Sequence, residues 1–100
     1  MSQVTFAVIT KTVAAAATPE KMIATATRIS GLVFSAPSTN TGNVFYQTSA
    51  VATTDRIPIP PGATLPISFG TFDWIDGSTI YLDAAVNGEG VQISYIKGKR

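Results

Sequence analysis

Residues 79–98, TIYLDAAVNGEGVQISYIKG, decide the fold class of this chain. Two runs rich in β-branched and aromatic residues, TIYLDAAV and VQISYIKG, lie on either side of the turn sequence NGEG. An Asn-Gly pair between such runs is typical of a hairpin, because glycine adopts positive φ without steric cost. We therefore predict two strands joined by a hairpin turn.

Short β-rich runs bounded by turn residues continue through most of the chain. KMIATATRIS and LVFSAP, separated by Gly31, read as two strands, and STNTG predicts a tight turn or hairpin before NVFYQTSA. Four prolines punctuate DRIPIPPGATLPISF, so this stretch is expected to hold a short edge strand, a Pro-Gly turn and a further strand. We find no amphipathic helix.

The N-terminal residues 4–13, VTFAVITKTV, alternate with a period of two. Val4, Phe6 and Val8 fall on one face, and Ile9 falls on the other. In AAAATP, Pro19 opposes a helix, so a turn or linker is expected, with a single helical turn as the alternative. We predict an extended N-terminal arm or strand over residues 1–18 and a β-sandwich domain over 19–100.

The spacing of these runs predicts an all-β fold. About seven or eight short strands, with turn signals every 8 to 15 residues, suit an antiparallel β-sandwich or jelly roll. An immunoglobulin-like arrangement is the competing prediction. A chain of 100 residues accommodates one such domain.

Composition narrows the classes of function. The chain has no histidine and no cysteine, so Ser-His-Asp and Cys-His catalysis, thiolate metal sites and disulfides are all excluded. Only 13% of residues are charged, against about 25% in ordinary domains. We expect no enzymatic activity, no cofactor and no metal, and a surface that other protein partly covers. A neutral, Thr-rich β surface is the alternative interpretation.

Charge and hydropathy also bear on partners. The net charge is +1, and three basic residues lie together at the C-terminus: Lys97, Lys99 and Arg100. They form a solvated end, or else a contact with nucleic acid or an acidic neighbour. Arg28 and Arg56 are isolated and no phosphate loop is present, so we expect no nucleic-acid partner. The longest apolar run, VAAAA, is far shorter than a membrane span of about 20 residues, so no membrane association is expected.

Candidate chemistry is confined to residues 72–89. The acidic residues there, Asp73, Asp76, Asp83 and Glu89, could in principle bind Ca²⁺ or cleave a glycosidic bond, but their spacing matches no calcium loop and favours turns. Trp74, next to Phe72 in FDWIDGS, is a candidate for stacking on a sugar or anchoring a protein contact, or else caps the core.

Several short motifs follow one another in an order that resembles small virion proteins of tailed bacteriophages. In chain order they are Ala36-Pro37, Asn40-Thr41-Gly42, Val44-Phe45-Tyr46, Pro61-Gly62, Ile80-Tyr81-Leu82-Asp83, Gly88-Glu89-Gly90 and Val91-Gln92-Ile93-Ser94-Tyr95. The resemblance covers residues 22–96. FDWIDGS departs from it, because the signature has a shorter polar turn at that place.

Within that class, the chain is most similar to capsid decoration (cement) proteins. The resemblance implies a non-enzymatic protein made in the host cytoplasm that binds the major capsid protein on the outside of the virion and stabilises capsomer contacts. It also implies a homo-oligomer, with a trimer favoured, and an extended terminal arm. The expected protein-contact residues are Val4, Phe6, Val8, Ile9, Phe72 and Trp74.

Two other functions remain open from the sequence. One is a glycan-binding β-sandwich module that uses Trp74 and the acidic residues near it. The other is a tail or head-completion component of the virion, which would be present in few copies per particle.

Overall fold

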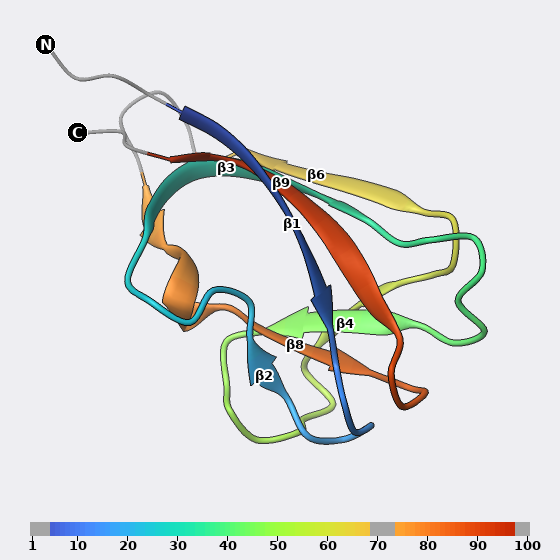
Figure 1. Cartoon of the computed structure of the whole chain (residues 1–100). Coiled ribbons are helices and arrows are strands. Elements are labelled where there is room, and N and C mark those ends of the chain that lie inside the picture. Colours follow the sequence, from blue (N-terminus) through green and yellow to red (C-terminus); the bar gives the residue numbers. More distant parts are fainter. Residues whose placement is uncertain (1–4, 69–73, 98–100) are drawn as a thin grey trace, which may run out of the picture.

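The computed structural model describes residues 5–68 and 74–97, which form two antiparallel sheets stacked face to face (Figure 1). Sheet A contains β1 (Thr5–Thr12), β3 (Arg28–Ser35), β6 (Thr64–Ser68) and β9 (Gly90–Lys97), and the short β7 (Ile75–Asp76) also pairs with β3. Sheet B contains β2 (Glu20–Lys21), β4 (Val44–Gln47), β5 (Ile57–Ile59) and β8 (Tyr81–Ala84). A 3₁₀ turn, η1 (Gly77–Thr79), connects β7 to β8.

The strand order is that of a jelly roll. Sheet A runs β1-β9-β3-β6 and sheet B runs β2-β8-β4-β5. A jelly roll is one long antiparallel hairpin that is wrapped into two sheets. The successive pairs of this hairpin are β1–β9, β2–β8, β3–β6 and, at its tip, β4–β5. The all-β, antiparallel sandwich expected from the sequence is therefore confirmed, and its connectivity is the jelly-roll one.

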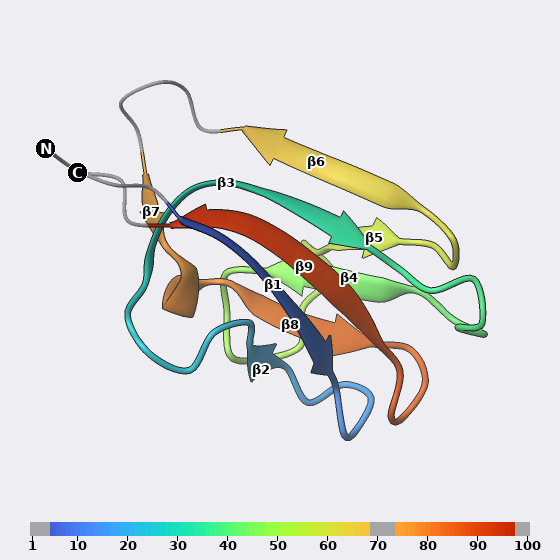
Figure 2. The same cartoon turned by 45° about the horizontal axis from the view of Figure 1, so that its top comes forward.

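The core lies between the sheets and follows the period-two alternation of the strands. Phe34 and Ile93 of sheet A and Leu82 and Val44 of sheet B are fully buried. The rings of Phe34 and Tyr46 stack across the two sheets, with centroids 5.1 Å apart. Figure 2 shows the long strands of sheet A side by side over the shorter strands of sheet B.

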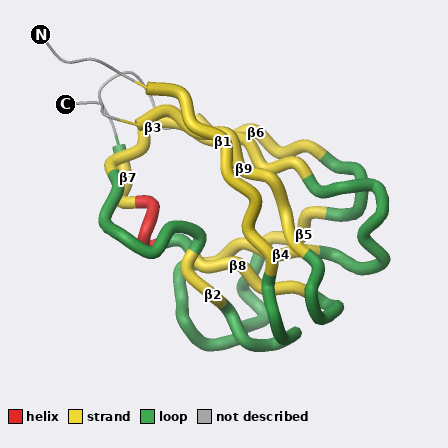
Figure 3. The backbone as a smooth tube through the Cα atoms, in the orientation of Figure 1, coloured by secondary structure: helices red, strands yellow, loops and turns green. Residues whose placement is uncertain are grey.

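The hairpin predicted at 79–98 is wrong, and of the two connections expected around STNTG the structure has a turn between the sheets and not a hairpin. β8 pairs with β2 and β4, whereas β9 pairs with β1 and β3, so the turn at Asn87-Gly88 crosses from one sheet to the other. The turn before β4 also joins the sheets (Figure 3). The apolar faces of β8 and β9 meet across the core, and that packing would be lost if the two strands paired edge to edge in one sheet.

The strand predicted over residues 21–30 is also wrong in its extent. Only Glu20 and Lys21 pair, and bends follow until β3 begins at Arg28. β3 then continues through Gly31, where the register with β9 shifts between Ile29 and Gly31. Gly31 therefore lies at a β-bulge inside one strand and does not separate two strands.

The proline-rich segment contains the predicted edge strand, turn and further strand. β5, which contains Pro58, is an edge strand of sheet B as expected, and β6, which contains Pro66, is an edge strand of sheet A, which the sequence did not indicate. The N–H of Ala63 donates to Pro60 O at 3.0 Å, and Gly62 has φ 79°, as a tight Pro-Gly turn requires. The described residues contain no helix that could cross a membrane.

β1 is an edge strand of sheet A, paired with β9 from Thr5 to Thr12. Phe6 and Val8 point away from the core, and Ala7 and Ile9 pack against it, as the alternation predicts. Val13 follows in the core and is fully buried. Residues 5–13 are thus packed into the sandwich.

Candidate interaction surface

Along β1, β6, β9 and residues 31–35 of β3, the outward-facing side of sheet A carries no charged side chain at any described paired position, whereas the charged pair Arg28 and Asp76 lies at the β7 end of the sheet. The β1–β9 and β3–β9 registers bring Val8, Ser94 and Val33 into one row, with Pro66 next to Val33 on β6. We call this surface the sheet A face. Its side chains are Phe6, Val8, Thr10, Val33, Ser35, Thr64, Pro66, Gln92, Ser94 and Ile96.

An open hollow of about 500 Å³ lies in the sheet A face, next to Gly31. Phe6, Val33, Pro66 and Ile96 contribute apolar side chains to its lining. Gly31 has no side chain to fill the space, and a Cβ placed there would come no nearer than 3.6 Å to Ile67 O. The glycine at the bulge of β3 therefore helps to keep this part of the hollow open.

The predicted contact residues divide into three groups. Phe6 and Val8 lie on the sheet A face and are 68% and 52% exposed. Ile9 points inward and packs against the core, so its side chain is not on that face. Val4 and Phe72 lie outside the described residues.

Trp74 stands apart from the sheet A face, just before β7. It is 44% exposed and does not belong to the buried core, which favours the contact interpretation over the core cap. The guanidinium of Arg28 lies 4.1 Å from the centroid of the Trp74 ring, a cation–π distance.

Sequence reasoning missed three apolar residues of the sheet A face: Val33, Pro66 and Ile96. Val33 and Ile96 have the outward parity of their strands, so alternation within residues 31–35, after the bulge, and within 90–97 could have found them. Pro66 gives no such signal, because a proline in a strand indicates an edge or a break and does not show which face its side chain takes. What brings the three together is the β6-β3-β9 order, which no local pattern contains.

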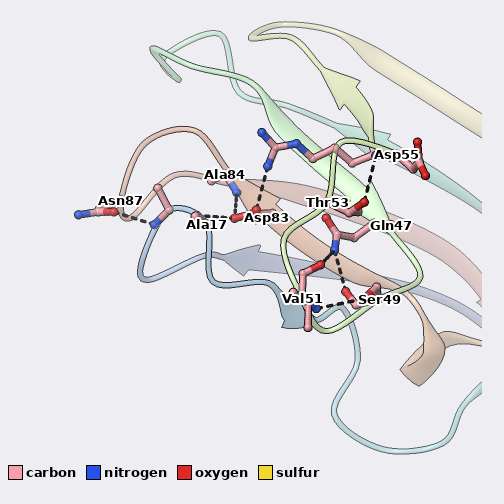
Figure 4. Close-up of polar contacts among 11 residues, drawn as sticks. Ala17, Gln47, Ser49, Val51, Thr53, Asp55, Asp83, Ala84 and Asn87 are labelled. Carbon is pink, nitrogen blue, oxygen red and sulfur yellow. Dashed lines mark hydrogen bonds and ion pairs between the residues drawn. The ribbon is translucent and has the colours of Figure 1, made fainter.

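The outward-facing side of sheet B is, by contrast, covered by the β4–β5 loop, residues 48–56. Gln47 is buried, and its Nε2 donates to Ser49 O at 2.7 Å and to Val51 O at 2.8 Å, which holds the loop against the sheet (Figure 4). The Val51 side chain itself is exposed. Sheet B therefore offers no open strand surface comparable to the sheet A face.

Asp83, one of the predicted acidic candidates, is fully buried beneath this loop and is structural. Its carboxylate accepts hydrogen bonds from Ala17 N at 2.9 Å, Ala84 N at 2.8 Å and Arg56 Nη1 at 2.9 Å. Arg56 also stacks on Phe45, 3.7 Å from the ring centroid. Both oxygens of the carboxylate are thus engaged, and they link the loops that contain Ala17 and Arg56 to β8. A carboxylate held in this way is not available as a catalytic acid or base.

Two further acidic residues serve as turn and cap groups. Backbone and side-chain hydrogen bonds from Ser78, with a third bond from Thr27 N, lower the pKa of Asp76 at the start of η1. Hydrogen bonds from Thr41 N and Gly42 N likewise lower the pKa of Glu89. Both pKa values fall because these donors favour the ionised carboxylate.

The acidic candidates therefore do not form one site. Asp76, Asp83 and Glu89 have separate hydrogen-bond partners, and Asp73 lies outside the described residues. Within residues 5–68 and 74–97, no group of three metal-ligating side chains could hold a metal ion.

No protein-family model, no curated protein and no solved structure matches this chain significantly.

Proposed function

We propose that this protein is a non-enzymatic structural protein that attaches to a larger protein assembly through its sheet A face. The observation that carries the proposal is a four-strand surface with five apolar side chains, a hollow and no charge. Contiguous apolar surface of this kind marks interaction sites on soluble proteins. A partner that covers it must itself present an uncharged, largely apolar surface.

Burial of apolar area would drive the attachment. Fully burying a side chain such as Phe6 or Val8 contributes about 1.5–3 kcal/mol relative to leaving it exposed. Ordering the interface opposes this gain, so one copy binds with modest affinity. Repetition of the contact over a symmetric assembly multiplies that modest affinity into stable attachment.

The motif order in residues 36–95 supports a phage virion as the assembly, and a capsid decoration protein as the particular role. The partner would then be the major capsid protein on the outer shell. A tail or head-completion component is the alternative within the virion. Counting copies per particle by quantitative mass spectrometry separates them, since decoration requires hundreds of copies and a completion component only a few.

A pair of valine variants tests the role of the sheet A face. Val33→Lys places a charge beside the hollow, and Val51→Lys makes the same change on the β4–β5 loop over sheet B. Binding to particles assembled without this protein should weaken at least about tenfold for Val33→Lys, because the lysine loses its hydration without gaining a partner. Val51→Lys should bind like the unaltered protein.

Equal binding of the two variants, with both folded by circular dichroism, would overturn the role of the sheet A face. Binding of the unaltered protein should also change little between about 0.05 and 0.5 M salt, because the face carries no charge to screen. A steep loss of binding in salt would point instead to the charged surface elsewhere.

The exposed Trp74 supports one alternative, a glycan-binding module, because jelly rolls also occur in lectins. Trp74 is the only tryptophan, so a sugar that stacks on it must alter the fluorescence of the protein. No change over a broad glycan panel would exclude this function at Trp74, and a saturable change would favour it over capsid attachment.

A further inference from the structure

The four edges of the sandwich are protected very unequally. In sheet B, β2 has two residues and β5 has three, one of which is Pro58. In sheet A, the β6 edge has five residues and contains Pro66, which has no N–H to donate. Short strands and prolines are the usual means of preventing strand addition at an edge.

The β1 edge has none of these protections. It is eight residues long, contains no proline and pairs only with β9 among the described strands. Every second residue of an antiparallel strand directs its N–H and C=O away from its neighbour, so β1 presents a row of backbone donors and acceptors on its other side. Such a row is a template for another strand.

The charge on β1 is consistent with an added strand. Lys11 is its only charged residue, and its Nζ binds Glu20 Oε1 at 2.7 Å. This ion pair neutralises the lysine within the same chain. A second strand therefore meets neither a net charge nor a row of like charges along β1.

We propose that β1 pairs with β1 of a second copy of this chain, antiparallel and centred on Val8. In this register Val8 lies opposite Val8, Ala7 opposite Ile9, and Lys11 opposite Thr5. Each lysine is thus kept away from its symmetry mate, and the inward apolar residues face apolar residues. The contact is isologous, so one two-fold axis closes the assembly at two copies.

A second copy suits this edge better than a ring of three. A ring needs two different complementary patches on each copy, and the other three strand edges are short or contain proline. Pairing of β1 with itself requires one edge only. It also joins the two sheets A into one continuous sheet, in which each copy contributes β1, β9, β3 and β6 in order and both sheet A faces lie on the same side, which doubles the width of that uncharged surface.

The first test measures the mass of the protein in solution, for the unaltered chain and for two variants that place opposite charges at Val8. Sedimentation equilibrium of the full chain should give about twice 10.5 kDa. Val8→Lys and Val8→Glu alone should each give the monomer mass, because like charges then face each other across the axis. An equimolar mixture of the two variants should return to the dimer mass. Val33→Lys, two strands away, should stay dimeric, which separates this contact from the proposed role of the sheet A face.

The second test uses the absence of cysteine from the chain. Val8→Cys brings two thiols within disulfide range across the axis, and mild oxidation with copper-phenanthroline should convert most of the protein to a covalent dimer. Thr10→Cys, opposite Phe6 in this register, should cross-link at least about tenfold more slowly. A monomer or trimer for the unaltered chain, a dimeric Val8→Lys variant, or equal cross-linking at positions 8 and 10 would overturn the proposal.

Discussion

Replacing Arg56 with alanine should destabilise the fold far more than breaking the ion pair between Lys11 and Glu20. Asp83 is fully buried and accepts hydrogen bonds from Arg56 Nη1, Ala17 N and Ala84 N. Without the guanidinium, the carboxylate keeps its buried position and two backbone donors but loses the opposite charge of Arg56. A buried charge without its partner is costly, because water replaces the lost interaction only in part.

The expected loss follows from the contacts of Arg56. The charge-assisted hydrogen bond to Asp83 contributes about 1.5–3 kcal/mol, and the stacking on Phe45 about 0.5–1 kcal/mol. The Arg56 side chain is 30% exposed, so water compensates in part. We expect a decrease of about 3 kcal/mol in the free energy of unfolding. For a domain of this size, that lowers the melting temperature by roughly 12–24 °C.

Urea denaturation followed by circular dichroism measures this loss, with Lys11→Ala as the matched control. The Lys11–Glu20 pair has a similar length, 2.7 Å against 2.9 Å, but both of its side chains are about 30% exposed. Its loss should cost under about 1 kcal/mol. Asp83→Asn added to Arg56→Ala should restore part of the stability, because the uncompensated charge is removed. Equal costs for the two single variants, or strict additivity with Asp83→Asn, would refute the reasoning.

Two further predictions concern close packing and acid. Gly90→Ala should lose at least about 3 kcal/mol, because its Cβ would overlap Lys11 O and lie 2.6 Å from Thr12 Cα. The free energy of unfolding of Gly31→Ala should stay within about 1 kcal/mol of that of the unaltered protein. Equal urea midpoints for Gly90→Ala and Gly31→Ala would contradict this prediction. Stability should also fall at low pH, because the pKa values of Glu20, Asp76 and Glu89 are lower in the folded protein than their ordinary values. These carboxylates contribute their full stability above about pH 5, and the contribution is lost as the pH falls through the folded pKa values. A urea midpoint equal at pH 3 and pH 7 would exclude this contribution from Glu20, Asp76 and Glu89.

The sequence predicts what depends on neighbouring residues and misses what depends on distant ones. Alternation alone places Phe6 and Val8 outward, and proline chemistry alone predicts an edge strand at Ile57–Ile59. The NGEG turn, however, has the same chemistry whether it closes a hairpin or crosses between sheets. Which of the two it does depends on burial of Leu82 against the opposite sheet, and those contacts lie far away in the chain.

The candidate site likewise combines properties that a local pattern predicts with properties that depend on distant residues. A β pattern marks Val33 and Ile96 as outward residues, but only the strand order makes them neighbours of Phe6 around one hollow. Asp83 looks like any acidic residue in a strand. Its burial depends on Arg56, 27 positions away, and on Ala17, 66 positions away, so no local pattern reveals that it is structural.

The pairing of β1 with β9 has a kinetic consequence for how the protein is made. The strand formed by residues 5–12 finds its partner only after residues 90–97 have left the ribosome, and β3 also waits for β9. Sheets built from such distant segments fold slowly, since the chain entropy of closing long loops is lost before the contacts form. During that interval the apolar strands of the N-terminal half are exposed, and a chain that stops short of residue 90 has no folded state to reach.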